Sequence, residues 1–555
     1  MTLTGNDLKM KVLSSLEKVF STDPFPNEEE ITEFTVFHNQ RLSFQIAVLN
    51  QRSSMNVKKV PVTVAGPLSD YVTVRQVVSV PVAYPASLAN LDDCYLRTQP
   101  GLYPDLLRPL HYQNSIPLPY GQTQALWITA DVPNHFPHGN YTITVRLGDL
   151  IEKTVTVQIL QEQLPPQKLI HTEWFYTDCI ADYYRVKVFS KAHWRMIERF
   201  LDTAVQNGIN MVLTPLFTPP LDTYVGGERT TTQLLGITVV SPNEYRFDFT
   251  LVEKWIDLCL SKGITYFEIP HLFTQWGAKN APKIVGKVNG RSKKLFGWST
   301  DALGNEYKCF LNQMLPALVA FLKKKGVYRN TFFHISDEPT IQDLEHYCNC
   351  KKIVSPYLED DHIIDALSDY PFFEKGVLSK PVAGIGHIQP FLEHNVQGLW
   401  AYYCGAGGCK SGTNRYISMP LHRVRILGVQ LYCAKIEGFL HWGYNYYNNQ
   451  YSHESINPFL HTDAEYFAPA GDAFLVYPGD DGIAWESLRL NAMREAMEDL
   501  RTLELCESKV GRNKVESLIR EECDEPLTFE TLPPKQFLLR LRKKLLAEIT
   551  KTKSL

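Results

Sequence analysis

The sequence predicts an α/β protein in which an N-terminal antiparallel β-sandwich domain precedes a (β/α)8 TIM barrel. Residues 1–165 alternate apolar and polar positions between turn signals, as half-buried antiparallel strands do. From residue 166 onward, amphipathic helices alternate with short, wholly apolar strands, which is typical of a parallel sheet covered on both faces. Eight such strand candidates occur within roughly 280 residues, which favours a closed barrel over an open sheet.

The N-terminal domain is predicted from runs such as "RLSFQIAVLNQ" and "GNYTITVRLGDLIEKTVTVQIL". Turn residues separate these runs, and "QEQLPPQK" at residues 161–168 indicates a linker that ends the domain. We therefore assign residues 1–165 to a sandwich whose expected role is packing and positioning.

The barrel is predicted from a repeated helix–strand unit. In "SKAHWRMIERFLDTAVQNG", Ser190 is placed to cap a helix whose apolar residues share one stripe and which ends at Gly208. The strand "INMVLTP" follows. The helix "SLRLNAMREAMEDLRTLELC" completes a barrel domain at residues 166–510, and residues 511–555 are predicted to form a solvated helical tail. The eight strand candidates lie near residues 169, 209, 264, 331, 362, 381, 396 and 437.

Composition excludes several classes of function. A net charge of -4 provides no basic field for nucleic acid. No signal peptide or long apolar run occurs, so we expect a cytoplasmic protein without a membrane partner. The eleven cysteines are scattered, and the pairs in "CNC" and "CGAGGC" lack further ligands at metal-binding spacing. No nucleotide-binding loop, "GxSxG" or "HExxH" motif is present, so we expect neither a metal nor a cofactor.

Carboxylates and aromatic residues follow the predicted strands. The catalytic face of a barrel lies at the carboxyl ends of its strands. Trp and Tyr rings cover the apolar faces of sugars while acids bind hydroxyl groups, so this mixture predicts a carbohydrate substrate. The candidate residues, in chain order, are Glu173, Glu268, Asp337, Glu338, Tyr370, Trp400, Tyr402, Tyr403, Trp442 and Asn445.

Asp337 and Glu338 are adjacent where the fourth strand ends in "HISDEP". Glycoside hydrolysis ordinarily needs two carboxyl groups on opposite sides of the bond, yet the seventh strand ends in "LWAYYC" without an acid. Adjacent carboxylates suit a mechanism in which the 2-acetamido oxygen of the substrate attacks the anomeric carbon. Glu338 would be the general acid and base, and Asp337 would hold the acetamido N–H.

Further expectations concern the surroundings of this pair. We expect an ionised Asp337 to keep the proton on Glu338, and Pro339 to hold Glu338 in an extended conformation. Tyr402 or Tyr403 would donate to the acetamido carbonyl group, but alternation lets only one of them point inward. Two alternatives stay open: a covalent mechanism with Glu268 or Glu173 as nucleophile opposite Glu338, and a carbohydrate-binding barrel without catalysis.

Four segments carry a family resemblance: "HISDEP", "LWAYYC", "GFLHWGYNYY" and "FLVYPGDDGIAWESLRLNAMREAMEDL". They resemble the domain of unknown function 4091, the catalytic barrel of glycoside hydrolase family 123 β-N-acetylgalactosaminidases. The resemblance implies an exo-acting, retaining enzyme that removes terminal β-linked N-acetylgalactosamine (GalNAc) without a metal. It places the catalytic pair of the family on Asp337 and Glu338, and residues around the sugar on Trp400, Trp442 and Asn445.

Overall fold

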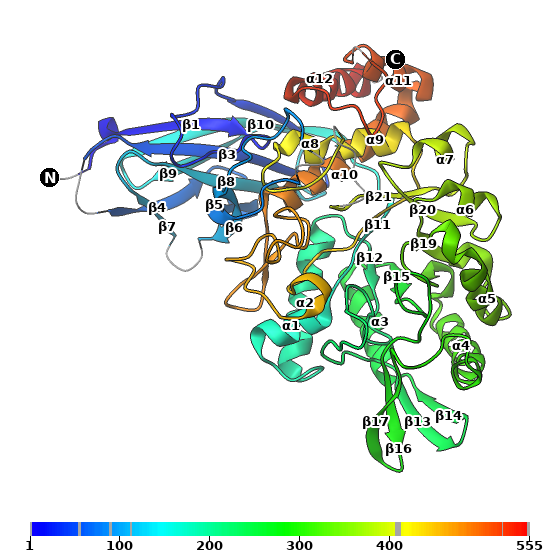
Figure 1. The fold of residues 1–555 in the computed structure, drawn as a ribbon. Helices are drawn as coiled ribbons and strands as arrows, with labels where there is room; N and C mark the ends of the chain where they lie inside the picture. Colours follow the sequence, from blue (N-terminus) through cyan, green and yellow to red (C-terminus); the bar gives the residue numbers. More distant parts are fainter. Residues whose placement is uncertain are drawn as a thin grey trace.

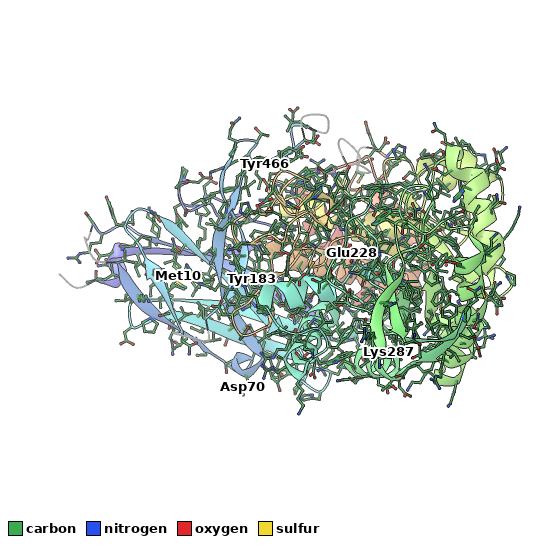
Figure 2. All side chains as sticks on the ribbon, turned by 60° about the horizontal axis from the view of Figure 1, so that its bottom comes forward. Met10, Asp70, Tyr183, Glu228, Lys287 and Tyr466 are labelled. Atoms are coloured by element: carbon green, nitrogen blue, oxygen red, sulfur yellow. The ribbon has the colours of Figure 1, made fainter. Side chains whose placement is uncertain are left out.

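The computed structural model describes residues 3–53, 57–87, 91–110, 114–405, 412–523 and 525–551. The fold is mixed α/β, with antiparallel sheets in the N-terminal part and an eight-stranded parallel barrel after them (Figure 1). In Figure 2, Met10 and Asp70 mark the N-terminal part on the left, and Glu228 and Lys287 mark the barrel part on the right. Within the described residues, no helix is long and apolar enough to cross a membrane.

The N-terminal part consists of two five-stranded sheets, antiparallel except where β2 and β10 pair in parallel. The two sheets share one hydrophobic cluster, in which the ring of Phe34 stacks on that of Phe44 across the sheets. The first sheet has the order β1 (Leu8–Ser14), β3 (Arg41–Asn50), β8 (Thr123–Asp131), β5 (Val72–Val82), β6 (Gly101–Pro109). The second has the order β2 (Glu33–His38), β10 (Ile151–Gln163), β9 (Gly139–Leu147), β4 (Lys58–Ala65), β7 (Ser115–Leu118).

The barrel confirms the predicted parallel strands, because each of the eight predicted regions contains one. A parallel bridge between Phe333 and Ile363 joins the two edge strands and nearly closes the ring. In order around the barrel the strands are β11 (Ile170–Glu173), β12 (Met211–Leu213), β15 (Tyr266–Ile269), β18 (Thr331–Phe333), β19 (Ile364–Ala366), β20 (Lys380–Gly384), β21 (Trp400–Tyr402) and β22 (Gly438–His441).

Helices connect the barrel strands. The predicted cap of the second helix is present, since the Ser190 hydroxyl accepts a hydrogen bond from His193 N. The helices are α1 (Thr177–Tyr184), α2 (Lys191–Gln206), α3 (Thr250–Lys262), α4 (Asn305–Lys325), α5 (Leu344–Val354), α6 (Tyr370–Glu374), α7 (Gln389–Glu393), α8 (Leu421–Arg425) and α9 (Leu427–Cys433). Short 3-10 turns lie at Gly5–Asp7, Ser69–Tyr71, Tyr328–Asn330, Ile341–Asp343, Asp360–His362 and Gln450–Ser452.

A four-stranded sheet that the sequence did not predict projects from the barrel, at the bottom of Figure 1. It is built from two hairpins that follow β12 and β15. Its order is β14 (Glu244–Asp248), β13 (Gly236–Ser241), β16 (Ile284–Val288) and β17 (Arg291–Phe296).

The C-terminal segment, which was predicted to form a solvated helical tail, packs against the rest of the protein. One face of its last helix is buried in a hydrophobic cluster that also contains Trp127 of β8 and Phe439 of β22. Because this cluster crosses the boundaries at residues 165 and 510, the three-domain division stays a prediction. The elements are β23 (Tyr477–Pro478), β24 (Ala484–Trp485), α10 (Leu488–Val510), α11 (Arg512–Arg520) and α12 (Lys535–Lys551).

Candidate active site

A pocket of about 140 Å³ opens at the carboxyl ends of the barrel strands. Its walls come from the ends of seven of the eight strands or the loops that follow them, so it occupies the position where barrel enzymes carry their chemistry. Three carboxylates and six aromatic residues take part. The lining residues are Trp174, Tyr176, Leu221, Asp222, Gln275, Trp276, Asp337, Glu338, Ala366, Tyr402, Cys404, Leu440, Trp442 and Phe467.

Glu338 lies at the mouth of this pocket in a left-handed backbone conformation, with φ of 43°. The expectation of an extended Glu338 before Pro339 is therefore wrong. A non-glycine residue in this region carries strain of about 1–3 kcal/mol, which persists only where its surroundings impose it. Here the Tyr402 hydroxyl donates to Glu338 Oε1 over 2.6 Å, and Ser368 Oγ lies 3.0 Å from the same hydroxyl. Tyr402 is thus the tyrosine that faces the pocket.

Asp337 is half-buried beside Glu338. Burial, and then the negative charge of Glu338, raise the pKa of Asp337 well above its usual range, while the charge of His334 opposes the rise. From the sequence we expected the reverse, an ionised Asp337 that keeps the proton on Glu338. The difference arises because the barrel mouth removes water from Asp337, whereas Glu338 is exposed.

A buried chain of charges lies beneath Asp337. His334 Nε2 is 2.6 Å from Glu268 Oε1, and His334 Nδ1 is 3.1 Å from Asp365 Oδ1. Burial alone would lower the pKa of His334, but the hydrogen bonds with Asp365 and Glu268 outweigh it and raise the pKa to about 10. Glu268 also accepts from Trp174 Nε1 and Thr172 Oγ1, so it positions Trp174 from inside the barrel and does not line the pocket.

His271 stacks on His334, with ring centroids 4.4 Å apart. Burial and the neighbouring His334 charge lower the pKa of His271 well below its usual value, so the ring is neutral. Neither of its nitrogens makes a hydrogen bond within the described part of the chain, and Nε2 lies 3.9 Å from Asp337 Oδ1. His271, His334 and Asp365 could hold a metal ion by proximity. Both nitrogens of His334 are already bonded to carboxylates, however, so an ionic network fits these residues better.

Glu173, a predicted sugar ligand, lies in a second buried network. Its Oε2 is 2.6 Å from Arg415 Nη1, and its Oε1 is 3.2 Å from His171 Nε2. Burial raises the pKa of Glu173, but Arg415 and the hydrogen bond with His171 outweigh this effect and lower it. Glu173 does not line the pocket, so its role is to neutralise Arg415 inside the barrel.

The remaining predicted ligands divide between the pocket and the core. Trp442 lines the pocket, and its Nε1 donates to Asp472 Oδ2. Asn445 lies behind the wall, where its side-chain amide makes hydrogen bonds with both backbone groups of Tyr176 and thereby fixes that ring. Of these two, only Trp442 is placed to touch a ligand.

Three further predicted ligands do not reach the pocket. Trp400 is buried in the barrel against Phe332, two residues below Tyr402. Tyr403 points to the opposite side of β21, where its ring packs against Phe439. Tyr370 begins helix α6, and its ring stacks on that of His394. Alternation along β21 explains the outcome for Tyr403, whereas Trp400 shares the face of Tyr402 and lies deeper in the barrel.

Asp222 was not predicted from the sequence, and it lines the pocket from the long loop after β12. Its Oδ2 accepts hydrogen bonds from the Tyr446 hydroxyl over 2.5 Å and from Tyr451 N over 2.9 Å. Burial raises the pKa of Asp222, and the bond from Tyr446 opposes the rise. Asp222 stands nine residues after the strand ends, so a search of strand ends does not reach it. Gln275, Tyr176 and Phe467 were also left out of the predicted site.

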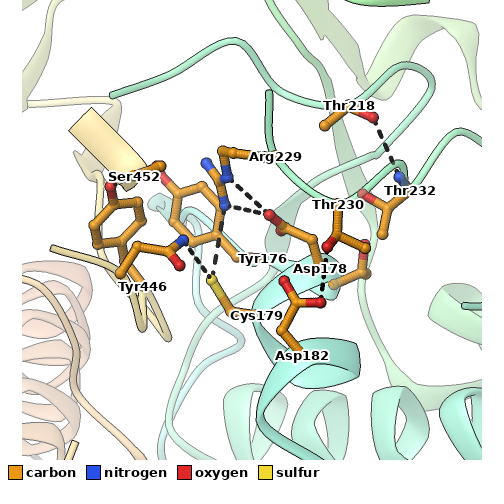
Figure 3. A network of polar contacts seen from close by, with 12 residues as sticks. Tyr176, Asp178, Cys179, Asp182, Thr218, Arg229, Thr230, Thr232, Tyr446 and Ser452 are labelled. Carbon is orange, nitrogen blue, oxygen red and sulfur yellow. Dashed lines mark hydrogen bonds and ion pairs between the residues drawn. The ribbon is translucent and has the colours of Figure 1, made fainter. Parts of the chain in front are cut away.

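Arg229 lies among Tyr176, Asp178 and Cys179 in a polar network (Figure 3), and Tyr176 lines the pocket. Its guanidinium group lies 2.7 Å from Asp178 Oδ2, and it covers the ring of Tyr176 at 4.8 Å and that of Tyr446 at 5.4 Å. The sulfur of Cys179 accepts from the same guanidinium group over 3.7 Å. Tyr176, which lines the pocket, and Tyr446, which lies behind it, therefore both pack against the buried ion pair of Arg229 and Asp178. Of the predicted cysteine pairs, Cys348 and Cys350 lie in α5, and Cys409 is outside the described residues.

Comparison with known proteins identifies a family and a similar fold. The model for the catalytic domain of glycoside hydrolase family 123 matches residues 174–506. A family 123 glycoside hydrolase from Clostridium perfringens, solved in a study of glycolipid glycan hydrolysis, has a TM-score of 0.73 and 14% identity. The match covers 98% of this chain and 97% of that one. A GH5 xyloglucanase from Bacteroides ovatus aligns at a TM-score of 0.31 and 8% identity, over 84% of this chain and 98% of that one. No curated protein matches the chain.

Proposed function

The chain belongs to glycoside hydrolase family 123, and on this premise we propose that it is an exo-acting, retaining β-N-acetylgalactosaminidase. The observation that carries the proposal is the adjacent pair Asp337 and Glu338 in a pocket to which β21 contributes no acid. Pockets for drug-sized ligands have volumes of roughly 300–1,000 Å³, so a smaller one suits a single terminal sugar ring rather than a chain. The substrate is a glycan or glycoconjugate that ends in β-linked GalNAc.

Glu338 is the proposed general acid and base. It is exposed at the pocket mouth, where a glycosidic oxygen would lie, and its carboxylate accepts from Tyr402. When GalNAc binds, the Tyr402 hydroxyl turns to the acetamido carbonyl group, and Glu338, as a carboxylic acid, gives a proton to the glycosidic oxygen. The acetamido oxygen attacks the anomeric carbon, which gives an oxazolinium intermediate. Glu338 then takes a proton from the water that opens the ring, so the configuration is retained.

Asp337 is proposed to accept the acetamido N–H and to stabilise the positive charge of the oxazolinium ring. Its raised pKa means that the free enzyme holds a proton there more readily than at an ordinary aspartate. A hydrogen bond from the substrate N–H favours the ionised form, so binding drives Asp337 to the state that catalysis needs. His334, charged beneath it, favours the same state.

A covalent mechanism remains the second candidate, now with a different nucleophile. Glu173 and Glu268, the nucleophiles considered first, do not line the pocket. Asp222 does, and this placement favours it as the carboxylate that could attack the anomeric carbon from the other side.

The test uses aryl β-glycosides of GalNAc, N-acetylglucosamine and galactose with the parent protein and three variants, Glu338→Gln, Asp337→Asn and Asp222→Ala. We expect the GalNAc compound to be cleaved and the galactoside to resist. Loss of general acid catalysis in Glu338→Gln should lower kcat by about 10²–10⁴-fold towards poor leaving groups. Asp337→Asn should lose activity as well.

Each alternative gives a different result. Equal cleavage of the galactoside and the GalNAc compound would exclude substrate assistance. Rescue of Asp222→Ala by azide, with an inverted glycosyl azide as product, would establish the covalent mechanism. Binding of all three sugars without turnover would leave a carbohydrate-binding barrel.

A further inference from the structure

A row of aromatic rings leads from the pocket to the protein surface. Trp276 lines the pocket and is 47% exposed. The edge of Tyr451 meets it at 5.8 Å between centroids, and the ring of His453 lies 6.4 Å further on. Tyr224, 41% exposed, stacks on His453 at 4.3 Å and 17°. We call these four residues the aromatic ridge.

The ridge is assembled from three loops that follow β12, β15 and β22, and hydrogen bonds hold the loops together. Tyr224 N donates to Tyr451 O over 3.1 Å, and Tyr451 N donates to Asp222 Oδ2 over 2.9 Å. Gln275 accepts from Asp222 N and donates to Thr223 O, which ties the second loop to the first. The ridge is therefore fixed to Asp222, a wall of the pocket itself.

Backbone strain is concentrated in the same loops. Asp222, Trp276 and Tyr451 have φ values of 44°, 55° and 59°, a region that residues with side chains rarely adopt. Strain of this kind persists where surrounding contacts impose it, and it is common at ligand clamps. Aromatic rings that face water do not stabilise the fold. Folding therefore does not explain why strained loops expose these rings.

The position of the proposed acid supplies that explanation. Trp276 N donates to Asp337 O over 3.3 Å, so the ridge begins beside the catalytic pair. If GalNAc fills the small pocket, the group on the other side of the glycosidic oxygen must lie at the mouth, next to Glu338. Trp276, which belongs to the ridge, lines the same pocket as Glu338.

We propose that the aromatic ridge is a leaving-group subsite that binds a neutral pyranose, the sugar to which the terminal GalNAc is attached. This inference rests on the proposed function. The apolar faces of a pyranose stack on Trp276 and then on Tyr224, and the polar edges of the sugar meet the exposed loop groups around His453. The enzyme should therefore prefer a sugar as leaving group over a simple alcohol.

The test compares two substrates with leaving groups of similar chemistry, methyl β-GalNAc and β-GalNAc linked to methyl galactoside. The parent protein should have the higher kcat/KM for the disaccharide. Trp276→Ala and Tyr224→Ala should each lower the ratio of the two kcat/KM values by about three- to tenfold, the range for one aromatic contact. Tyr224→Phe should restore the ratio, since stacking needs the ring and not the hydroxyl.

Tyr120→Ala is the matched control, because Tyr120 is 55% exposed and lies in the N-terminal part. It should leave the ratio as in the parent. A parent ratio near one, or an equal loss on both substrates in the ridge variants, would overturn the subsite.

A binding measurement separates the subsite from the catalytic proposal. The Glu338→Gln variant should bind the disaccharide more tightly than methyl β-GalNAc by calorimetry, and the added change Tyr224→Ala should remove the difference. This result would support the ridge even if neither substrate were cleaved, which would defeat the proposed function alone. Equal affinities in Glu338→Gln would overturn the ridge whatever the activity.

Discussion

At the scale of the residue, His334 carries a charge in the centre of the barrel. A buried charge is tolerated only when it is paired and hydrogen-bonded, and His334 has a carboxylate at each ring nitrogen. The same charge keeps the stacked His271 neutral and acts against the raised pKa of Asp337. One buried imidazolium therefore influences the protonation of Asp337 from inside the barrel.

His334 also makes stability depend on pH. Its folded-state pKa of about 10 lies above the unfolded value of about 6.5, so its contribution is complete below pH 6.5 and is lost as the pH rises through 10. We expect the Tm of the parent protein to fall between pH 7 and pH 10. His334→Gln should have a lower Tm than the parent protein at pH 7, but its Tm should fall less between pH 7 and pH 10. The exposed His394 gives the control, since His394→Gln should keep the parental fall; an identical fall in all three proteins would contradict the prediction.

Single residues show what the sequence could and could not predict of the site. Asp337 and Glu338 were predicted because they are neighbours at a strand end, a local feature. Glu173 and Glu268 were misassigned because their partners are remote in the chain: Arg415 stands 242 residues after Glu173, and His334 stands 66 residues after Glu268. A carboxylate at a strand end looks the same in sequence whether it meets a substrate or a buried cation.

At the scale of the element, the loop after β12 depends on Arg229 for its position. The loop carries Asp222, and Arg229 bonds to Leu221 O as well as to Asp178 of α1. The same side chain covers Tyr176 and Tyr446, which lie in or behind the pocket wall. The loop and α1 are therefore joined at one buried cation.

Arg229→Ala should lower stability and activity together. It leaves Asp178 buried without its partner, which costs about 3–5 kcal/mol. It also releases the loop that holds Asp222, so kcat/KM should fall although Arg229 does not line the pocket. Arg229→Lys keeps the charge but loses the planar contacts of the guanidinium group. Its stability and its kcat/KM should therefore lie between those of the parent and those of Arg229→Ala. The exposed Arg291 on β17 is the control: Arg291→Ala should match the parent in Tm and kcat/KM, and an Arg229→Ala protein as stable as Arg291→Ala would refute the role.

The barrel strands were predictable as elements, whereas the projecting sheet was not. Each barrel strand is a continuous apolar run beside an amphipathic helix, and both patterns are local. The projecting sheet depends on the parallel pairing of β13 with β16, which joins two hairpins that are separated by α3 and β15. Nothing in either hairpin alone specifies that pairing.

At the scale of the whole molecule, the N-terminal sheets and the barrel are joined by buried polar contacts as well as by the shared hydrophobic cluster. Arg489 of α10 makes a two-pronged ion pair with Asp105 of β6, both N···O distances being 2.9 Å. The Tyr477 hydroxyl donates to the same carboxylate over 2.7 Å. Arg489 also donates to the carbonyl groups of Gly471 and Phe474, in the segment that follows Phe467 of the pocket.

This arrangement predicts that replacing Asp105 destabilises both the N-terminal part and the barrel. Asp105→Ala leaves the Arg489 charge buried and unpaired, which costs about 3–5 kcal/mol, whereas an exposed ion pair contributes roughly 0–1 kcal/mol. The control is Glu152, which pairs with Arg146 at 2.6 Å on the protein surface, so Glu152→Ala should leave the Tm nearly unchanged.

Calorimetry of Asp105→Ala should show one transition at lower temperature, with activity lost in the same range. Because Arg489 bonds to the carbonyl groups of Gly471 and Phe474 as well as to Asp105 of the N-terminal sheet, the two parts should not melt apart. A separate early transition of the N-terminal part, with activity retained beyond it, would show that the two parts are independent domains.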